Sequence, residues 1–553
     1  MKEGFRQCMA WLHTWSGLVV GWVLFFVFVT GTAGYFVYEI DRWMRPELPL
    51  IASTAIAPHD ALAKGQAYLE RHAAGADAWT ISLPGERSQP GLGVSWQPRR
   101  ADGERGGGRG RGKRVTLDAH TGEAVESDKV RATGGGHLLY RMHYQLHYVS
   151  YDVAIRVVGV CTMLMLLAIL SGVVTHKKIF KDFFTFRPAK GQRSWLDAHN
   201  LISVMALPFF VMITYSGLVF FMFDYMPLGV AGVYGTTENA SEQFFDELYP
   251  QRNDGDGAPR VPSALTPLAP LLTAAEQQWG PGQVQRVSIS RPYDASGEIV
   301  LSRRSQAEIG NAPALRFHAV TGASIASDKP EAGAKAFQSV LFGLHEGRFA
   351  SPLLRWFYLL SGLLGAAMIA TGLVLWTVKR KLKQDKLVKA GQRREFGFRL
   401  VECLNIGTLA GLPLAVAVYF WSNRLLPVDL AVRRDWEVNA MFIAWGLALL
   451  YPALRPSLRA WFEELSLVAA AFSLLPLLNW LTTARHLGVT LPAGDFVLAG
   501  VDLTMLAIGT FFALAAGKVR RKLSAGPAPS KPVRPAAAAP SQAPAQAEPD
   551  RAI

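Results

Sequence analysis

The segment from Tyr140 to His147, YRMHYQLH, carries two histidines four residues apart, just before the apolar run from Val153 to Val174. Residues at this spacing lie on one face of a helix, so both imidazoles would face the same way at the mouth of a membrane span. Histidine is a common metal ligand and a common axial ligand of haem iron. The stretch therefore indicates a metal or cofactor site at the membrane edge.

The elements that must position these histidines are predicted to be membrane helices. Half of the 553 residues are hydrophobic and only 18% are charged, which is typical of a membrane protein. A helix that crosses the hydrocarbon core needs about 20 mainly apolar residues. By this criterion the chain is a polytopic α-helical membrane protein with about eight spans, near 11–38, 153–175, 199–223, 355–377, 399–421, 437–454, 461–482 and 496–517.

Basic residues orient these spans. They collect in four stretches, 175–193, 378–394, 455–459 and 518–522. With an even number of spans, these stretches and both termini lie on the same side, which the positive-inside rule identifies as the cytoplasm. The net charge of +14 is then largely a topological signal. It requires no nucleic-acid partner.

The three cysteines, Cys8, Cys161 and Cys403, lie at or within predicted spans and form no close pair in the sequence. This spacing argues against a disulfide framework, and the absence of a C-x-x-C-H motif argues against covalently attached c-type haem. Any haem would be held by side-chain ligands alone.

The first part of the chain is an internal duplication. Each predicted outer loop begins with a helical pattern, at 57–73 and 261–280, and ends in a strand, a Thr-Gly turn and a strand, at 115–125 and 315–325. We therefore expect two small α+β domains outside the membrane. The repeated unit is a span, an outer domain and a span, and parallel repeats of this kind are commonly related by a pseudo-two-fold axis along the membrane normal.

One pair of histidines is matched by the repeat on the cytoplasmic side. His13 and His199 each open a span that runs outward. The register that aligns Gly31 with Gly217, near the ends of those spans, aligns the two histidines without a gap. The repeat therefore predicts an inner pair of imidazoles.

A second pair is predicted on the outer side, but the repeat does not fix both members. His345 precedes a span, as YRMHYQLH does. Counted back from the matched Gly172 and Gly372, His345 falls midway between His143 and His147. The outer partner of His345 is thus either of these two histidines.

A pseudo-two-fold axis brings equivalent positions together, so each pair could present two imidazoles to one flat macrocycle, as in bis-histidine b-type haem. His176 stands opposite Trp376 in the other copy and has no symmetric partner. Glycines in these spans, including Gly17 and Gly31, are expected mainly to let helices approach closely, and also to make room for a porphyrin face.

The order of motifs along the first 380 residues resembles the PepSY-associated transmembrane family. The motifs are WLHTWSG (11–17), LDAHTGE (117–123), an R-x-H-x-x-L element (141–146), DAH (197–199) and LHEG (344–347). The family includes iron-regulated inner-membrane proteins that act as siderophore reductases. The resemblance rests on motif order, spacing and the duplicated domain type together.

This resemblance implies an enzyme with two b-type haems that passes electrons across the bacterial inner membrane and reduces ferric siderophore in the periplasm. It implies His13 and His199 as ligands of the inner haem iron, and His143 with His345 as ligands of the outer one. His147, beside His143, is an alternative outer ligand. His176 occupies a position where the family pattern suggests tryptophan, so it is a candidate third inner ligand. The electron donor would be a quinol or a redox protein, and the other partner is membrane lipid.

The predicted organisation has seven parts. They are a transmembrane helix (1–40), a periplasmic PepSY-like domain (41–140), two transmembrane helices with a basic cytoplasmic loop (141–223), a second PepSY-like domain (224–344), a fourth transmembrane helix (345–380), a further four-helix transmembrane region (381–523) and a disordered Ala/Pro-rich cytoplasmic tail (524–553). The further four-helix region resembles nothing that would assign it a role.

Two other classes of function stay open from the sequence. The chain could be a haem-bearing electron conduit for another acceptor, such as a copper or quinone couple. Alternatively it binds no haem, and its paired outer domains bind peptides or restrain a peptidase. A nucleotide cofactor is not indicated, because GGGRGRG (106–112) does not lie between a strand and a helix.

Overall fold

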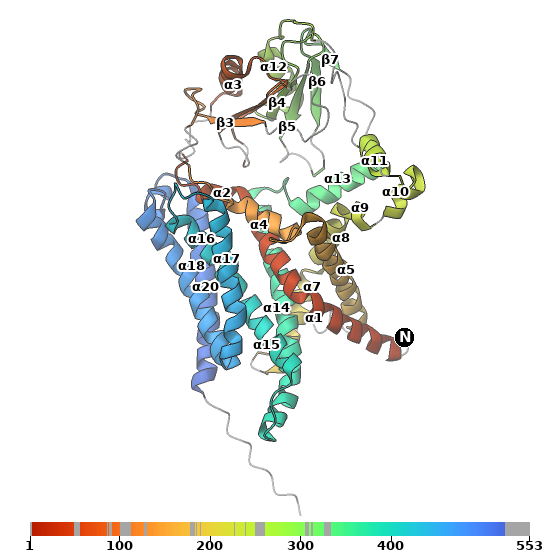
Figure 1. The fold of residues 1–553 in the computed structure, drawn as a ribbon, viewed down its shortest axis with the longest axis vertical. Helices are drawn as coiled ribbons and strands as arrows, with labels where there is room; N and C mark the ends of the chain where they lie inside the picture. The colour runs from red at the N-terminus through yellow and green to blue at the C-terminus, as the bar shows by residue number, and fades with distance from the viewer. Residues whose placement is uncertain are drawn as a thin grey trace, which may run out of the picture.

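A computed structural model shows a bundle of long helices beneath a small layer of sheet and helix (Figure 1). It describes residues 3–48, 56–85, 87, 91–99, 112–125, 130–176, 183, 185–188, 190–225, 227–237, 239–248, 260–304, 309–310, 313–325 and 333–525. The predicted disordered tail, from residue 526 on, and most of the GGGRGRG segment lie outside these residues.

Within the described residues, seven helices are long and apolar enough to cross a membrane, and there are up to eight spans if one bent pair counts as a span. The long helices are α1 (Glu3–Gly34), α5 (Tyr151–Thr175), α14 (Pro352–Lys389), α15 (Phe396–Leu409) continuing into α16 (Gly411–Leu425), α17 (Arg433–Leu450) continuing into η3 (Tyr451–Leu454), α18 (Ser457–Thr482) and α20 (Phe496–Ser524).

The bent pair is α7 (Gln192–Met205) and α8 (Leu207–Phe220), which meet at 67°. The break falls at Ala206, two residues before Pro208. A proline ring lacks an N–H and interrupts the hydrogen-bond ladder of a helix. The predicted third span, 199–223, is therefore two short helices rather than one straight helix.

The outer segments form one sheet rather than two separate domains. Helix α3 (Pro58–Ala73) and strands β1 (Ala78–Ser82), β2 (Leu92–Gln97) and β3 (Lys113–Leu117) come from the first copy. Helix α12 (Leu268–Trp279) and strands β4 (Val284–Ser290), β5 (Glu298–Arg303), β6 (Ala314–His318) and β7 (Ser324–Ile325) come from the second. The strand order is β3-β2-β1-β4-β5-β6-β7. Pairing β1 with β4 removes an exposed edge from each copy, which is the physical reason for the merger.

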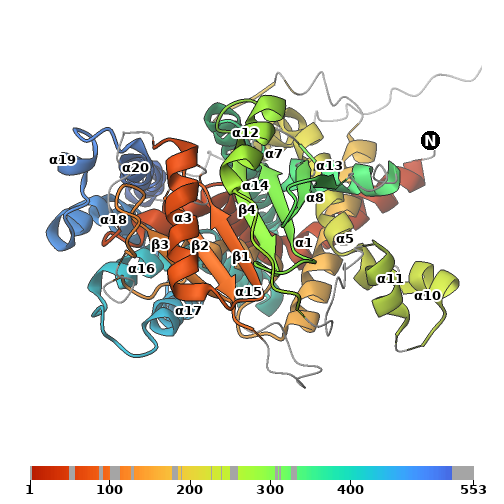
Figure 2. The same cartoon turned by 90° about the horizontal axis from the view of Figure 1, so that it is seen from above.

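The β1–β4 junction is symmetric. Thr80 of WTIS (79–82) and Ser288 of VSIS (287–290) occupy the same place in the two copies, and they pair directly with each other. The pseudo-two-fold axis thus passes between these two residues. Helices α3 and α12 cover the face of the sheet that points away from the membrane helices, with a buried apolar core between the two layers (Figure 2).

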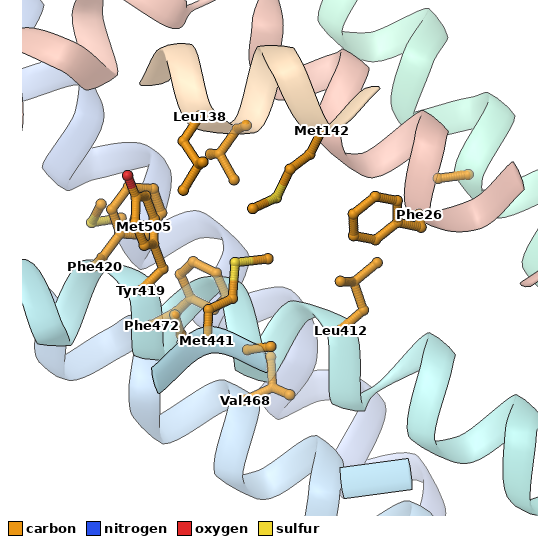
Figure 3. Packing of buried hydrophobic residues seen from close by; sticks show 14 of the residues in the cluster. Phe26, Leu138, Met142, Leu412, Tyr419, Phe420, Met441, Val468, Phe472 and Met505 are labelled. Carbon is orange, nitrogen blue, oxygen red and sulfur yellow. The ribbon is translucent and has the colours of Figure 1, made fainter. Parts of the chain in front are cut away.

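Shorter helices lie where the long helices meet this outer layer. They are α2 (Val37–Trp43), α4 (Gly135–Tyr144), α9 (Met222–Tyr225), α10 (Pro227–Tyr234), α11 (Ala240–Leu248), α13 (Gly333–Glu346) and α19 (Leu487–Thr490). Two of them are equivalent in the repeat: α4 leads into α5, and α13 leads into α14. The largest apolar core joins α1 and α4 to the last helices of the chain (Figure 3).

Two fully buried glutamates in those last helices predict opposite effects on stability. Glu437 of α17 is 0% exposed, and Arg433, Thr133 and Asn423 all hydrogen-bond it. Glu464 of α18 is 1% exposed, and neither carboxyl oxygen has a partner among the described residues. An unpartnered buried polar group costs about 1–3 kcal/mol, whereas removing one member of a buried ion pair costs about 3–5 kcal/mol.

We expect Glu464→Met to raise the free energy of unfolding by about 1–3 kcal/mol. We expect Glu437→Met to lower it by about 3–5 kcal/mol. Thermal unfolding of the purified protein in detergent would measure both, each variant serving as the control for the other. A lower midpoint for Glu464→Met would show that its carboxyl group has a stabilising partner.

Candidate functional site

The inner pair predicted from the repeat comes together in the structure. His13 lies in the first third of α1 and His199 in the middle of α7. Their ring centres are 6.2 Å apart and the ring planes meet at 64°. Both residues come from helices that begin at the basic end of the bundle.

The same backbone positions of the two copies hold these rings. His13 Nδ1 is 2.7 Å from the carbonyl oxygen of Ala168 on α5, and His199 Nδ1 is 3.0 Å from that of Met368 on α14. Ala168 and Met368 are equivalent in the repeat, each four residues before a matched glycine. The Thr371 hydroxyl also lies 3.2 Å from His199 Nδ1.

The outer pair consists of His143 on α4 and His345 on α13, with ring centres 5.9 Å apart and planes at 42°. His143 Nδ1 is 2.8 Å from the carbonyl oxygen of Val27 on α1. His345 Nδ1 is 2.9 Å from the Ser216 hydroxyl of α8, and that hydroxyl lies 3.3 Å from the Ile213 carbonyl oxygen. Val27 and Ile213 are again equivalent positions in the two copies.

Each of the four rings also lies against a glycine of the helix that holds it. A Cβ added at these glycines would come within 2.3 Å of a ring atom at Gly31 and within 3.1–3.2 Å at the other three. The contacts are Gly31 with His143, Gly172 with His13, Gly217 with His345 and Gly372 with His199. No side chain fits at Gly31 unless the imidazole moves, so this glycine is required by the ring and not only by helix packing.

We call the carbonyl and the glycine that hold each ring its seat. A sequence pattern accompanies all four seats, although it was not recognised from the sequence alone. In all four cases the supporting carbonyl is followed, three residues later, by Ser or Thr and then by the glycine. The four segments are VFVTG (27–31), AILSG (168–172), ITYSG (213–217) and MIATG (368–372). From the sequence alone these glycines are expected mainly to let helices approach closely, and also to make room for a porphyrin face, because nothing in the sequence says that a histidine faces each glycine.

The arrangement leaves the other ring nitrogen available. An imidazole whose Nδ1–H donates to a carbonyl has its lone pair on Nε2, which is the usual way that a protein orients a histidine ligand. Metal–imidazole bonds are about 2 Å long, so two rings on opposite sides of one metal have their centres about 6 Å apart. Both pairs match this spacing.

The number of donors fits a haem better than a bare ion. Each pair supplies two imidazoles, whereas a structural zinc site usually needs four protein ligands. In the part of the chain that the structure describes, no group of three or more His, Cys, Asp and Glu side chains could hold a metal ion. A haem brings four nitrogens of its own and needs only the two axial ligands that each pair offers.

Burial keeps the outer imidazoles neutral, which is the form that binds a metal. It lowers the pKa of His143. For His345, burial and then the neighbouring His143 lower the pKa to about 3. Both rings are therefore unprotonated at neutral pH and can act as ligands.

The structure separates His147 from this site. Helix α4 ends at Tyr144 and the chain is extended at Gln145, so the prediction that His143 and His147 share one helical face is wrong. The His147 ring stacks on Phe442 of α17, with centres 5.5 Å apart and planes at 20°. His143 is the residue that faces His345.

His176 follows Gly172 by four residues at the end of α5, one helical turn from the seat of His13. Its Nδ1 is buried and has no hydrogen-bond partner among the described residues. The same is true of Nε1 of Trp376, the equivalent residue after Gly372. Both copies thus leave a buried polar atom beside the inner pair, available to a bound group.

An ionic link ties the outer layer to the membrane helices near the outer pair. Arg87 binds both oxygens of Glu39 on α2, at 2.9 and 2.8 Å, and Arg355 at the start of α14 binds the same carboxylate at 2.7 Å. Burial raises the pKa of Glu39, but the hydrogen bonds and charges of the two arginines outweigh it and hold the pKa below the usual 4.5.

Because the folded-state pKa of Glu39 is lowered, the link contributes stability at neutral pH and loses it only as the pH falls through that lowered pKa. We expect the hydrogen-exchange protection of α2, its rate compared with the intrinsic rate at the same pH, to fall on acidification below pH 4.5. Glu39→Gln should show low protection at every pH. Equal acid dependence in the variant would assign the effect to another group.

A family model described as the PepSY-associated TM region matches residues 10–379. The chain belongs to the PepSY-associated transmembrane family. This confirms the resemblance seen in the motifs, and the match includes all four paired histidines and their glycine seats. An uncharacterized protein of Pseudomonas aeruginosa is 27% identical over 391 residues, which cover 67% of this chain and 92% of that protein. Helices α15 to α20 begin after the matched family region.

Proposed function

We propose that this multi-pass membrane protein is a di-haem oxidoreductase of the bacterial inner membrane, which reduces ferric siderophore to release Fe²⁺ in the periplasm. The observation that carries the proposal is the two histidine pairs, each with two partly buried rings about 6 Å apart and every Nδ1 held. Both termini would be cytoplasmic, since the basic stretches gather at that end.

The distance between the two histidine pairs, measured along α1, supports electron transfer across the membrane. His13 and Val27, whose carbonyl holds His143, are fourteen residues apart on α1. In a regular helix this is a rise of about 21 Å. Two sites at that separation divide a hydrocarbon core of about 30 Å into shorter steps.

When bound, a b-type haem at each pair would supply a one-electron carrier. The residues of the chain would hold it: the Nε2 atoms would bind the iron, the carbonyls fix the rings, and the surrounding apolar helices would exclude water. One electron converts each Fe³⁺ to Fe²⁺, a softer ion to which the hard oxygen donors of a siderophore are less suited. A quinol, which gives two electrons and two protons, would serve two ferric siderophores; a redox protein would supply single electrons.

The side chains of the outer sheet suit a polar substrate on the outer side of the membrane. The sheet face opposite α3 and α12 carries Thr80, Ser288 and the neighbouring Ser95 and Ser302, with the exposed Arg286. This face points toward the membrane helices that carry the outer pair (Figure 1). Hydroxyl and guanidinium groups suit an oxygen-rich ferric chelate.

A reduced-minus-oxidised absorption spectrum of the purified protein tests the haem. The proposal expects b-type bands and two haems per chain, and sub-stoichiometric iron without such bands would leave the haem-free peptide-binding class instead. Anaerobic mixing of the dithionite-reduced protein with a ferric hydroxamate should then reoxidise the haem. An unchanged spectrum after mixing would point to a conduit for another acceptor.

A further inference from the structure

We propose that the helices beyond the family region, α15 to α20, position the outer ligand helix α4 and thereby set the orientation of His143. The effect on the haem rests on the proposed function. The contacts between α4 and the last helices do not depend on that function. It gives a role to a part of the chain for which neither motif nor family offers one.

Side chains of α16 and α17 hold the start of α4. Glu437 accepts a hydrogen bond from the Thr133 hydroxyl at 2.5 Å, and the same hydroxyl accepts one from the Gly135 N–H at 3.1 Å. Tyr419 donates to the Gly135 carbonyl at 3.0 Å. Arg433 donates to the carbonyl of Ala132 at 2.9 Å. Three residues before and at the start of α4, Ala132, Thr133 and Gly135, are thus held by the added helices.

The groups that make these contacts are themselves held. Glu437 also accepts from Asn423 at 2.8 Å and from Arg433, and Arg433 reaches the Asn423 carbonyl at 2.6 Å. All of them are buried, as is Tyr419. A buried network in which each member is satisfied is rigid, because any displacement leaves a charge or donor unpaired.

The apolar face of α4 lies in one buried cluster to which α1, α2 and the last helices of the chain all contribute. Leu138, Leu139 and Met142 belong to one buried cluster with residues of α16, α17, α18 and α20. Figure 3 shows Leu138 and Met142 pointing down toward Leu412 and Met441. Met142 is adjacent to His143, so the rotation of α4 that buries Met142 also decides where the imidazole points.

The chain after α4 is held by the same region. His147 stacks on Phe442 of α17, and Tyr148 packs against Phe442 and hydrogen-bonds Asn439. The contacts of α17 therefore bracket α4 at both ends. His147, with no counterpart in the other copy, belongs to this support.

The equivalent helix α13 has less cover. Its Phe337 is 58% exposed and its Val340 38% exposed, whereas the apolar face of α4 is buried. The two outer ligands are thus alike in their seats but unlike in their support. The added helices act on one member of the outer pair.

The test compares single hydrogen-bond deletions in the full-length protein. Thr133→Val and Tyr419→Phe each remove a contact to α4, Thr133→Ser restores the hydroxyl, and Trp421→Phe removes a bond from α16 to Ala471 that does not reach α4. The readouts are redox-poised absorption and electron paramagnetic resonance of the two haems, the outer one assigned with His143→Ala, and hydrogen exchange of α4 and α13.

We expect the first two variants to shift the midpoint potential and resonance signal of the outer haem, leave the inner haem unchanged and speed exchange in α4 only. Thr133→Ser and Trp421→Phe should behave as the wild type. Unchanged outer signals in both deletions, or equal shifts of both haems, would overturn the proposal. If the wild type holds no haem, the proposed function fails, and the exchange of α4 against α13 still decides the positioning.

Discussion

His143→Ala is expected to remove one of the two haems, whereas His147→Ala should retain both. His143 faces His345 at 5.9 Å and is the ring that Val27 holds, so its loss leaves the outer site with a single axial ligand. His147 lies against Phe442 instead. Its loss removes packing, which costs stability but no iron–nitrogen bond.

The haem content per chain, by pyridine haemochrome assay, measures this pair of variants. His345→Ala should reproduce the loss seen with His143→Ala, and the double variant should lose no more than either single one. Normal haem in His143→Ala together with a loss in His147→Ala would move the outer ligand to the segment after α4.

Gly31→Ala is expected to have an effect nearly as large, although it changes neither a ligand nor a polar group. The added methyl would lie 2.3 Å from Nδ1 of His143, which is too close for any contact. The ring must move and lose its hydrogen bond to Val27. We expect loss of the outer haem or a high-spin outer signal, with the inner haem intact.

Gly4→Ala is the matched control, because it lies in the same helix, away from both histidine pairs, and a Cβ there meets nothing within 4 Å. Alanine is favoured over glycine inside a helix by about 1 kcal/mol, so this variant should be as stable as the wild type or more stable. Absorption spectra at fixed potential would compare the two. An unaltered outer haem in Gly31→Ala would show that helix α4 can retreat without cost.

The sequence could predict the histidine pairs because the duplication supplies a second copy to align. It could not choose between His143 and His147, since that choice depends on where α4 ends. The helix stops at Tyr144 and the chain turns extended at Gln145, so the four-residue spacing does not mean a shared face. No capping residue in YRMHYQLH announces this end.

The outer layer was only partly predictable for a related reason. The helix and strand patterns of each copy are local and were recognised as repeats. Whether β1 and β4 pair with each other is a long-range property, which alternation along a strand does not encode. The bend between α7 and α8 was in principle visible at Pro208, but the apolar run on both sides of it suggested a straight span.

Each ring is seated on a helix of its own copy, yet each pair joins one ring from either copy, as the strand pairing of Thr80 with Ser288 does in the sheet. A single copy would therefore contain one histidine of each pair and no complete pair. Two such copies related by an exact two-fold axis would complete both sites on the axis itself, and a closed symmetric dimer is the commonest assembly of identical chains. Joining the two copies in one chain ensures that each outer sheet is made together with both histidine pairs. It also allows the two copies to differ in sequence, as α4 and α13 do.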